Sequence, residues 1–300
     1  MPVGERTCLT SEQTDLVRDP ALIEATPPPE LAFRRKVSLI DAIRSLASAW
    51  EMVTTLTERE LRIRYKQAVL GVAWALLQPV ILIFTLTTFI GKLAKIDTDY
   101  KTYALFAVCG LVPWTFFASA VGQGGMSLLQ NLQLINKINC PREVFPLAMV
   151  GVAAVDTITS MLAVIVLFAI HTTMPHAAAF VWAVPLILIE IFFAMGISLL
   201  VSSLVVHIRD IRHVLPVVIQ MGIIFTPVMW PFDGLSHGRQ ILYAIVNPLG
   251  PVIDAWRRTA LHGTMPDLQM LGIAAASSIV IFFIGFRVFK RLEASFADLL

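Results

Sequence analysis

Two carboxylate side chains lie inside long apolar runs of this sequence, where a charge is costly to bury. They are Asp156 and Glu190. A carboxylate in a membrane-spanning helix often marks a proton or ion pathway, so the two groups could act as carriers. Alternatively, each is hydrogen-bonded between helices or is kept protonated by its apolar surroundings. The sequence leaves both interpretations open, although a relay normally uses several aligned groups.

Patterns for covalent, metal or nucleotide chemistry are absent from the sequence. The six histidines show no HExxH or similar spacing, and neither a GxSxG nor a Cys/His nucleophile pattern occurs. The three cysteines, Cys8, Cys109 and Cys140, are too widely spaced for a CxxC motif. No GxxxxGKS or GxxxxGKT segment is present, so the sequence has no phosphate-binding loop. We therefore expect no enzymatic activity, no metal and no cofactor in this chain.

Two further groups of side chains could contact a ligand. Four basic residues precede the first long apolar run and could attract an anion, or could simply anchor the chain at a membrane surface. They are Arg59, Arg62, Arg64 and Lys66. Aromatic side chains gather at two places, where they could form an interfacial belt or stack on sugar rings. These are Trp114, Phe116 and Phe117 at the first place, and Trp230 and Phe232 at the second.

The composition predicts which elements position these residues. The 300-residue chain is 57% hydrophobic and 15% charged, whereas soluble domains are roughly 45–50% apolar and about 25% charged. A helix needs about 20 apolar residues to cross a bilayer. Six continuously apolar runs are candidates, and they favour helices over the alternating strands of a barrel. They are Leu70 to Ile90, Ala104 to Leu129, Leu147 to Ile170, Phe180 to Val206, the shorter Val214 to Met229, and Leu268 to Phe289.

The basic residues fall mainly on one side of these six runs. If all six cross, one side collects 17 Lys and Arg and the other collects 6. The positive-inside rule then places both termini in the cytoplasm. The first 30 residues have no apolar core segment, so we expect no secretory signal peptide. The net charge of +2, without a basic block, gives no indication of a nucleic-acid partner.

Two regions outside the runs are expected to be structured. Apolar residues recur every three or four positions before the first run, which predicts an amphipathic helix over residues 37–66, at the membrane surface or against a partner. They are Ile40, Ile43, Leu46, Trp50, Val53 and Leu56. Between Trp230 and Asp267, the short apolar stretches 241–246 and 252–256 and several prolines predict re-entrant half-helices.

These elements divide the chain into four parts. Residues 1–36 form a tail that Pro27, Pro28 and Pro29 interrupt. Residues 37–66 form the amphipathic helix, residues 67–291 a six-helix transmembrane domain, and residues 292–300 a cytoplasmic C-terminal tail. The expected fold class is therefore an all-α integral membrane protein.

Several segments, in order along the chain, resemble the membrane-spanning subunits of bacterial polysaccharide ABC exporters. They are ERELRIRYKQAVLGVAWALLQP (58–79), LVPWTFF (111–117), NLQLINKINCPREVFPL (131–147), VVHIRDIRHVLP (205–216), TPVMWP (226–231), NPLGPVIDAWRR (247–258) and FRVFKRLEASFADLL (286–300). The family comprises type-2 permeases for O-antigen, teichoic acid, capsule or galactan. The resemblance runs from about residue 37 to the end of the chain.

The resemblance implies a homodimer in the bacterial inner membrane that pairs with two copies of a separate ABC ATPase. ATP and Mg²⁺ would then bind to the partner, and the substrate would be a lipid-linked glycan. The loop from Asn131 to Pro146 would dock in the ATPase, with the turn after residue 205 beside it. The residues implied in this coupling are Asn131, Lys137, Pro141, Arg142, Glu143, Arg209 and Asp210.

The resemblance also suggests a place for the basic and aromatic groups. The basic residues from Arg59 to Lys66 would meet the pyrophosphate of the substrate, and aromatic faces at Trp114, Phe116, Phe117 and Trp230 would line its path. Two other classes of function remain. An ion-coupled secondary transporter would use Asp156 and Glu190, and an intramembrane enzyme would require a paired acid and base that the spans do not contain.

Overall fold

The computed structural model of this chain describes residues 49–66, 77, 81, 85, 100–135, 137, 140–170, 175–293 and 296. Throughout these residues the regular structure is helical, which confirms the all-α class. The helices are α4 (Trp50–Lys66), α6 (Tyr100–Gln130), α7 (Leu132–Ile135), α8 (Val144–Ile170), α9 (Ala177–His207), α10 (Ile211–Phe225), α11 (His237–Val246), α12 (Leu249–Arg257) and α13 (Leu268–Glu293). Two short turns, η1 (Phe232–Gly234) and η2 (Arg258–His262), complete the set.

Four of the described helices are long and apolar enough to cross a membrane, namely α6, α8, α9 and α13. Each matches one of the predicted runs, with ends displaced by no more than about four residues, as expected for boundaries read from sequence. Helix α10 covers the short fifth run but has only 15 residues. The run 70–90 lies outside the described residues except at positions 77, 81 and 85. Four of the six predicted spans are therefore supported by the structure, and the total of six remains a prediction.

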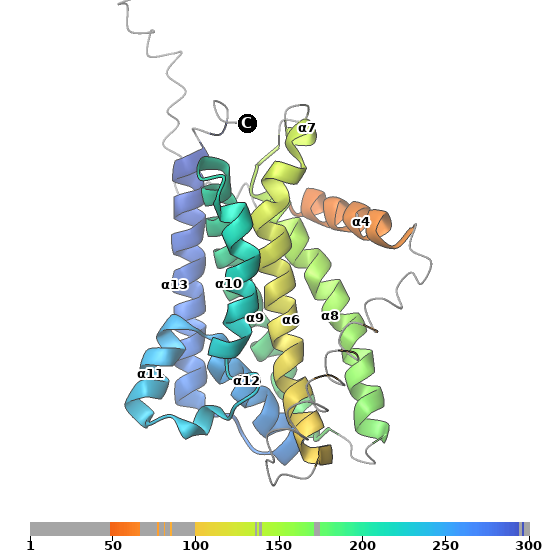
Figure 1. Cartoon of the computed structure of the whole chain (residues 1–300), viewed down its shortest axis with the longest axis vertical. Helices are drawn as coiled ribbons and strands as arrows, with labels where there is room; N and C mark the ends of the chain where they lie inside the picture. Colours follow the sequence, from red (N-terminus) through yellow and green to blue (C-terminus); the bar gives the residue numbers. More distant parts are fainter. Residues whose placement is uncertain are drawn as a thin grey trace, which may run out of the picture. The chain divides into compact units, whose positions relative to one another are not determined.

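The long helices pack side by side; α6, α9 and α13 run in one direction and α8 runs in the opposite direction (Figure 1). Helix α7, the turn between α9 and α10, and the C-terminal end of α13 lie at one end of this bundle, while α11 and α12 lie at the other. The end with α7 carries the loops that the distribution of Lys and Arg predicts to lie together on the cytoplasmic side. Helix α4 lies across the bundle and packs against α8 near that end.

Small residues allow the helices to approach closely. A Cβ atom placed on Gly285 of α13 would lie 2.1 Å from the carbonyl oxygen of Gly196 in α9. A Cβ atom on Gly196 would in turn lie 2.7 Å from the Cα atom of Phe282. Helix α9 also donates a hydrogen bond to α6, from Ser198 Oγ to the carbonyl oxygen of Ala120 at 3.0 Å. Such contacts are typical of helices packed within a membrane.

The outer faces of the helices expose large apolar side chains. Ile158 of α8, Val181 of α9 and Phe225 of α10 are each at least 66% exposed. A soluble protein seldom leaves so extended an apolar surface in water. Together with the four long apolar helices, these faces identify the chain as a multi-pass membrane protein.

The two flanking regions contain helices, as expected, within the described residues. Helix α4 covers residues 50–66 of the predicted amphipathic helix, with Val53 buried on α8 and Trp50 65% exposed. Helices α11 and α12 contain the two short apolar stretches, 241–246 and 252–256, of the last long loop. Whether these two helices enter the membrane remains a prediction.

Candidate functional site

Asp156 is held by the surface helix α4. Arg64 donates hydrogen bonds to the Asp156 carboxylate and to the amide oxygen of Gln123 in α6. The hydroxyl of Tyr65 donates to the second Asp156 oxygen. Burial and the neighbouring carboxylate raise the pKa of Tyr65 to about 12, so this hydroxyl remains a donor at neutral pH. Asp156 of α8 is therefore hydrogen-bonded to α4, and Arg64 extends this network to α6.

The other basic residues of α4 divide into two groups. The side chain of Arg59 is 46% exposed, and its Nη1 lies 3.3 Å from Asn131 Oδ1 at the end of α6 and 3.4 Å from Glu60 Oε1. Arg62 and Lys66 are exposed as well, and Arg62 forms an ion pair with Glu58 at 2.5 Å. An anion approaching α4 could therefore reach Lys66 and, in competition with Glu58, Arg62, while Arg59 and Arg64 are also held by contacts with the bundle.

The loop between α7 and α8 is fixed to α13 by an ion pair. Glu143 has 0% exposure, and Lys290 Nζ lies 2.7 Å and 2.8 Å from its two carboxylate oxygens. Lys290 also contacts Glu293 at 3.0 Å. Burial raises the pKa of the Glu143 carboxyl, and the Lys290 ammonium opposes that rise. Such a pair is held firmly, because either charge alone would be left in an apolar setting.

A second set of contacts surrounds Phe296, which is fully buried. The guanidinium of Arg142 lies 5.7 Å from its ring centroid and donates to the carbonyl oxygen of Glu293 at 3.1 Å. On another side, the ring of His207, at the end of α9, also lies 5.7 Å from that centroid. Phe296 thus contacts both the loop before α8 and the segment before α10.

The residues expected to couple to an ATPase differ in their accessibility. Lys137, Arg209 and Asp210 are exposed and lie in the loop and turn at one end of the bundle. Asn131 and Glu143 are buried, at 8% and 0% exposure. Pro141 and Arg142 are partly buried. A direct contact with another protein is therefore open to the first group, while the buried residues can act by holding the loop in place.

The first group of aromatic residues forms part of the core. Trp114 and Phe116 are 6% and 4% exposed. Phe117 stacks on Phe193 of α9 with ring centroids 4.8 Å apart, and Trp114 tilts against Phe117 at 5.9 Å. In this structure these faces contact one another, so stacking on a sugar ring would require the helices to move apart.

Trp230 belongs to the segment that joins α10 to α11. Its indole N–H donates to the carbonyl oxygen of Ile224 at 3.1 Å. Its ring meets that of Tyr243 edge-on, with centroids 6.2 Å apart. Trp230 is partly buried and therefore offers part of one ring to the outside.

Arg257 is a key buried residue that the sequence did not indicate. It is 3% exposed and donates to four backbone carbonyl oxygens: Phe106 at 3.2 Å, Pro227 at 2.7 Å, Val228 at 2.6 Å and Trp230 at 3.3 Å. Its guanidinium carbon also lies 3.5 Å from the ring centroid of Phe106. Arg257 therefore ties α12 to α6 and to the segment after α10. In the sequence, the position of this arginine within a short apolar stretch was the feature that could have indicated its burial.

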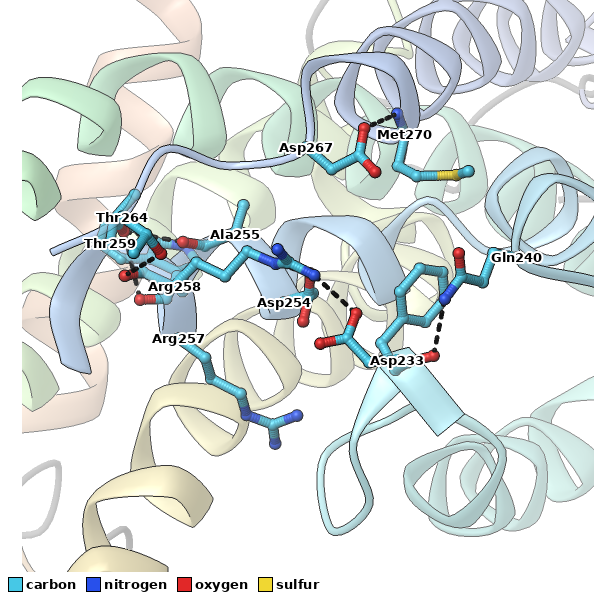
Figure 2. A network of polar contacts seen from close by, with 12 residues as sticks. Asp233, Gln240, Asp254, Ala255, Arg257, Arg258, Thr259, Thr264, Asp267 and Met270 are labelled. Carbon is cyan, nitrogen blue, oxygen red and sulfur yellow. Dashed lines mark hydrogen bonds and ion pairs between the residues drawn. The ribbon is translucent and has the colours of Figure 1, made fainter. Parts of the chain in front are cut away.

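The neighbouring Arg258 points in a different direction, as Figure 2 shows, and forms two ion pairs. It contacts Asp254 and Asp233, each at 2.6 Å. Asp267 lies nearby at the start of α13, where its carboxylate accepts hydrogen bonds from the backbone N–H groups of Gln269 and Met270 (Figure 2). These contacts fix the connections of α12 to η1 and of η2 to α13.

Glu190 and Asp156 take part in different contacts. Glu190 is 5% exposed, lies in α9 and faces a cavity between α6, α8 and α9. In the described residues, its Oε1 atom has no hydrogen-bond partner. Nor do the described residues contain a group of three or more His, Cys, Asp or Glu side chains that could hold a metal ion. The structure thus assigns the two intramembrane carboxylates to separate sites.

Sequence comparisons place these features in a family. The profile described as ABC-2 type transporter matches residues 51–261. An O-antigen export system permease protein of Klebsiella pneumoniae is 28% identical over 257 residues, which cover 85% of this chain and 97% of the relative. Its counterpart in Myxococcus xanthus is 24% identical over 268 residues, with 87% and 99% coverage. A polysialic acid transport protein of Escherichia coli is 23% identical over 245 residues, with 80% and 93% coverage.

The profile match includes nearly all of α4, the loop that Glu143 fixes, and the Arg257 contacts of α12. Because it extends over more than half of the chain, this protein belongs to the ABC-2 type transporter family.

Proposed function

We propose that this chain is the membrane subunit of an ATP-driven exporter that moves a lipid-linked polysaccharide out of the cytoplasm. Two copies would form the path, and two copies of a separate ABC ATPase would drive it. The main support is the agreement with O-antigen and polysialic acid permeases over 93–99% of their lengths. A hydroxyl-rich polymer needs such a path, because its polar groups would lose their hydrogen bonds in hydrocarbon.

The loop 131–146 is the proposed input for the ATPase. Lys137 is exposed there, and Glu143 is paired with Lys290 of α13. A displacement of the loop would therefore reach a membrane-spanning helix through a buried ion pair. Arg209 and Asp210 in the α9–α10 turn provide a second exposed surface at the same end of the bundle. The contacts of Phe296 with Arg142 and His207 link the two inputs.

The proposed substrate contact at the membrane surface is on α4. Arg62 and Lys66 are exposed, and the pyrophosphate of a lipid-linked glycan would bind Lys66 and compete with Glu58 for Arg62. Arg59 and Arg64 hold the helix by their contacts with Asn131 and Asp156. The opposing interpretation, simple anchoring of the chain by basic residues, predicts no effect of Arg62 or Lys66 on export.

Reconstitution of the chain together with the proposed ABC ATPase partner tests the proposal. We expect lipid-linked glycan to stimulate ATP hydrolysis, and the paired changes Lys137→Glu and Arg209→Glu to weaken that stimulation without changing thermal stability. Arg239→Glu is the matched control, because Arg239 is also exposed but lies on α11 at the opposite end. Export by the isolated chain, driven by a proton or sodium gradient, would refute the proposal.

The same preparation tests the ion-coupled alternative. Because Asp156 is paired with Arg64 and Tyr65, Asp156→Asn should retain ATP-dependent export. Arg64 is 36% exposed, so we expect a stability loss of only about 1 kcal/mol or less. Loss of export in Asp156→Asn at unchanged stability would favour a relay.

A further inference from the structure

We propose that the cavity between α6, α8 and α9 binds a membrane-dissolved amphiphile with an apolar chain and a hydroxyl-bearing head. The cavity has a volume of about 360 Å³. This volume lies at the lower end of the range for small-molecule sites. The proposal concerns a site that neither the coupling loop nor the path between two copies requires, and it does not depend on the proposed function.

The polar lining of the cavity supports a hydrogen-bonding ligand. Glu190 Oε1 and Trp256 Nε1 are both buried, and neither has a hydrogen-bond partner among the described residues. Both side chains line the cavity, one from α9 and the other from α12. Thr157 lines it as well, but its hydroxyl proton is already donated to the carbonyl oxygen of Ala153 at 2.8 Å. Buried polar atoms are normally satisfied, so these two atoms indicate a missing partner.

The two atoms define what that partner must offer. The Glu190 carboxyl oxygen needs a donor, and the Trp256 indole N–H needs an acceptor. A hydroxyl group can donate to the first or accept from the second, whereas a hydrocarbon chain alone can do neither. The remaining wall is apolar and includes Val112, Met161 and Ile187, which suit a hydrocarbon chain. The complementary ligand is therefore a long-chain alcohol or a lipid with a hydroxylated head.

The mouth of the cavity explains where the ligand comes from. Ile158, Ile165 and Phe180 line the cavity and are 66%, 50% and 67% exposed. They lie on α8 and α9, two of the helices long enough to cross the bilayer. Because this rim is apolar, access is sideways from the hydrocarbon and does not pass through water. A membrane lipid is the expected source of the ligand.

Photolabelling of the full chain in phosphatidylcholine nanodiscs tests the site. The probe is a hexadecanol that carries a diazirine on its chain, and the matched probe is the corresponding alkane without the hydroxyl. We expect the alcohol to label peptides of α8 and α9 that line the cavity about fivefold more than the alkane, the ratio that one net hydrogen bond provides. Equal labelling by both probes would overturn the hydroxyl assignment.

Two adjacent substitutions separate the cavity from the lipid-facing surface. Ala183 lines the cavity, whereas Val184 is 63% exposed on the outside of the same helix. Ala183→Phe should fill the space and reduce labelling by the alcohol about fivefold, to the level of the alkane, while Val184→Phe should leave it unchanged. If Ala183→Phe is labelled as strongly as the wild type, or if a second copy covers the mouth and labelling is absent, the proposal is wrong.

Substitution of Glu190 tests the polar contact itself. Glu190→Leu should keep the shape of the site and lose the preference for the alcohol over the alkane. Its thermal unfolding without ligand should be unchanged or shifted upward, because an unsatisfied buried group has been removed. A variant that retains the preference would show that Glu190 is not the acceptor.

Discussion

Replacing Lys290 by Met removes the counter-ion of a carboxylate that has no contact with solvent. Glu143 is 0% exposed, and the side chain of Lys290 is 17% exposed. Breaking a buried ion pair usually costs about 3–5 kcal/mol, and the partial exposure of Lys290 favours the lower end of that range. A loss of about 3 kcal/mol corresponds to a decrease in melting temperature of roughly 6–12 °C. Met preserves most of the apolar volume, so the change reports mainly on charge.

The loss of stability in Lys290→Met should depend on pH, because the remaining Glu143 carboxyl can take up a proton. Burial raises the pKa of Glu143, and Lys290 opposes the rise, so Lys290→Met should raise this pKa further. The folded variant then binds more protons than the unfolded chain, and its stability falls as the pH rises through that interval. We therefore expect the variant to be closer to the wild type at pH 5.5 than at pH 8, because protonation removes the unpaired negative charge.

Thermal unfolding of the full chain in nanodiscs, followed by tryptophan fluorescence, measures both effects. Arg291→Met is the matched control, since Arg291 is the next residue and is exposed. The double variant Glu143→Gln with Lys290→Met should recover much of the loss, because no buried charge remains. Equal stability of Lys290→Met and the wild type at pH 8, or a double variant no more stable than the single one, would refute this account of the loop.

Two further substitutions test helix packing and the buried arginine. Gly285→Ala should destabilise the chain by about 1–3 kcal/mol, because its Cβ atom would collide with Gly196. Gly272→Ala is the control in the same helix: its Cβ atom would meet no atom within 4 Å, so thermal unfolding should change little. Arg257→Met leaves four carbonyl oxygens without their donor and should cost more than about 3 kcal/mol, whereas Arg258→Met should cost about 1 kcal/mol. The yield of monodisperse protein in fluorescence-detected gel filtration compares Arg257→Met with Arg258→Met. Equal yields would contradict the conclusion that Arg257 stabilises the fold.

The fold was predictable where a single physical quantity decides it. Run length and hydropathy sufficed for α6, α8, α9 and α13, because a bilayer requires about 20 apolar residues regardless of context. Helix α10 has only 15 residues, so length alone does not decide whether it crosses. Periodicity predicted the helix over α4, although a periodic pattern does not say against which surface the helix packs.

The site was predictable only in part, because its contacts join distant positions. Arg64 and Asp156 were each singled out, yet they are separated by 92 residues and nothing local indicates the pairing. Glu143 was expected to face a partner protein, and the structure pairs it with Lys290, 147 residues further on. Arg257 was counted as an ordinary charge of the outer loop. Three of its four carbonyl acceptors lie in the segment after Phe225, where helix α10 ends.

The positions of these partners along the chain bear on biogenesis, since a ribosome delivers the N-terminal part first. The four carbonyl groups described above as acceptors for Arg257 precede it in the sequence, so they have already been synthesised when Arg257 emerges. Glu143 is in the opposite situation, because Lys290 is translated near the end of synthesis. A truncated product that lacks α13 would therefore leave the loop 131–146 without its anchor, and only a finished polypeptide would present that loop in the form described here.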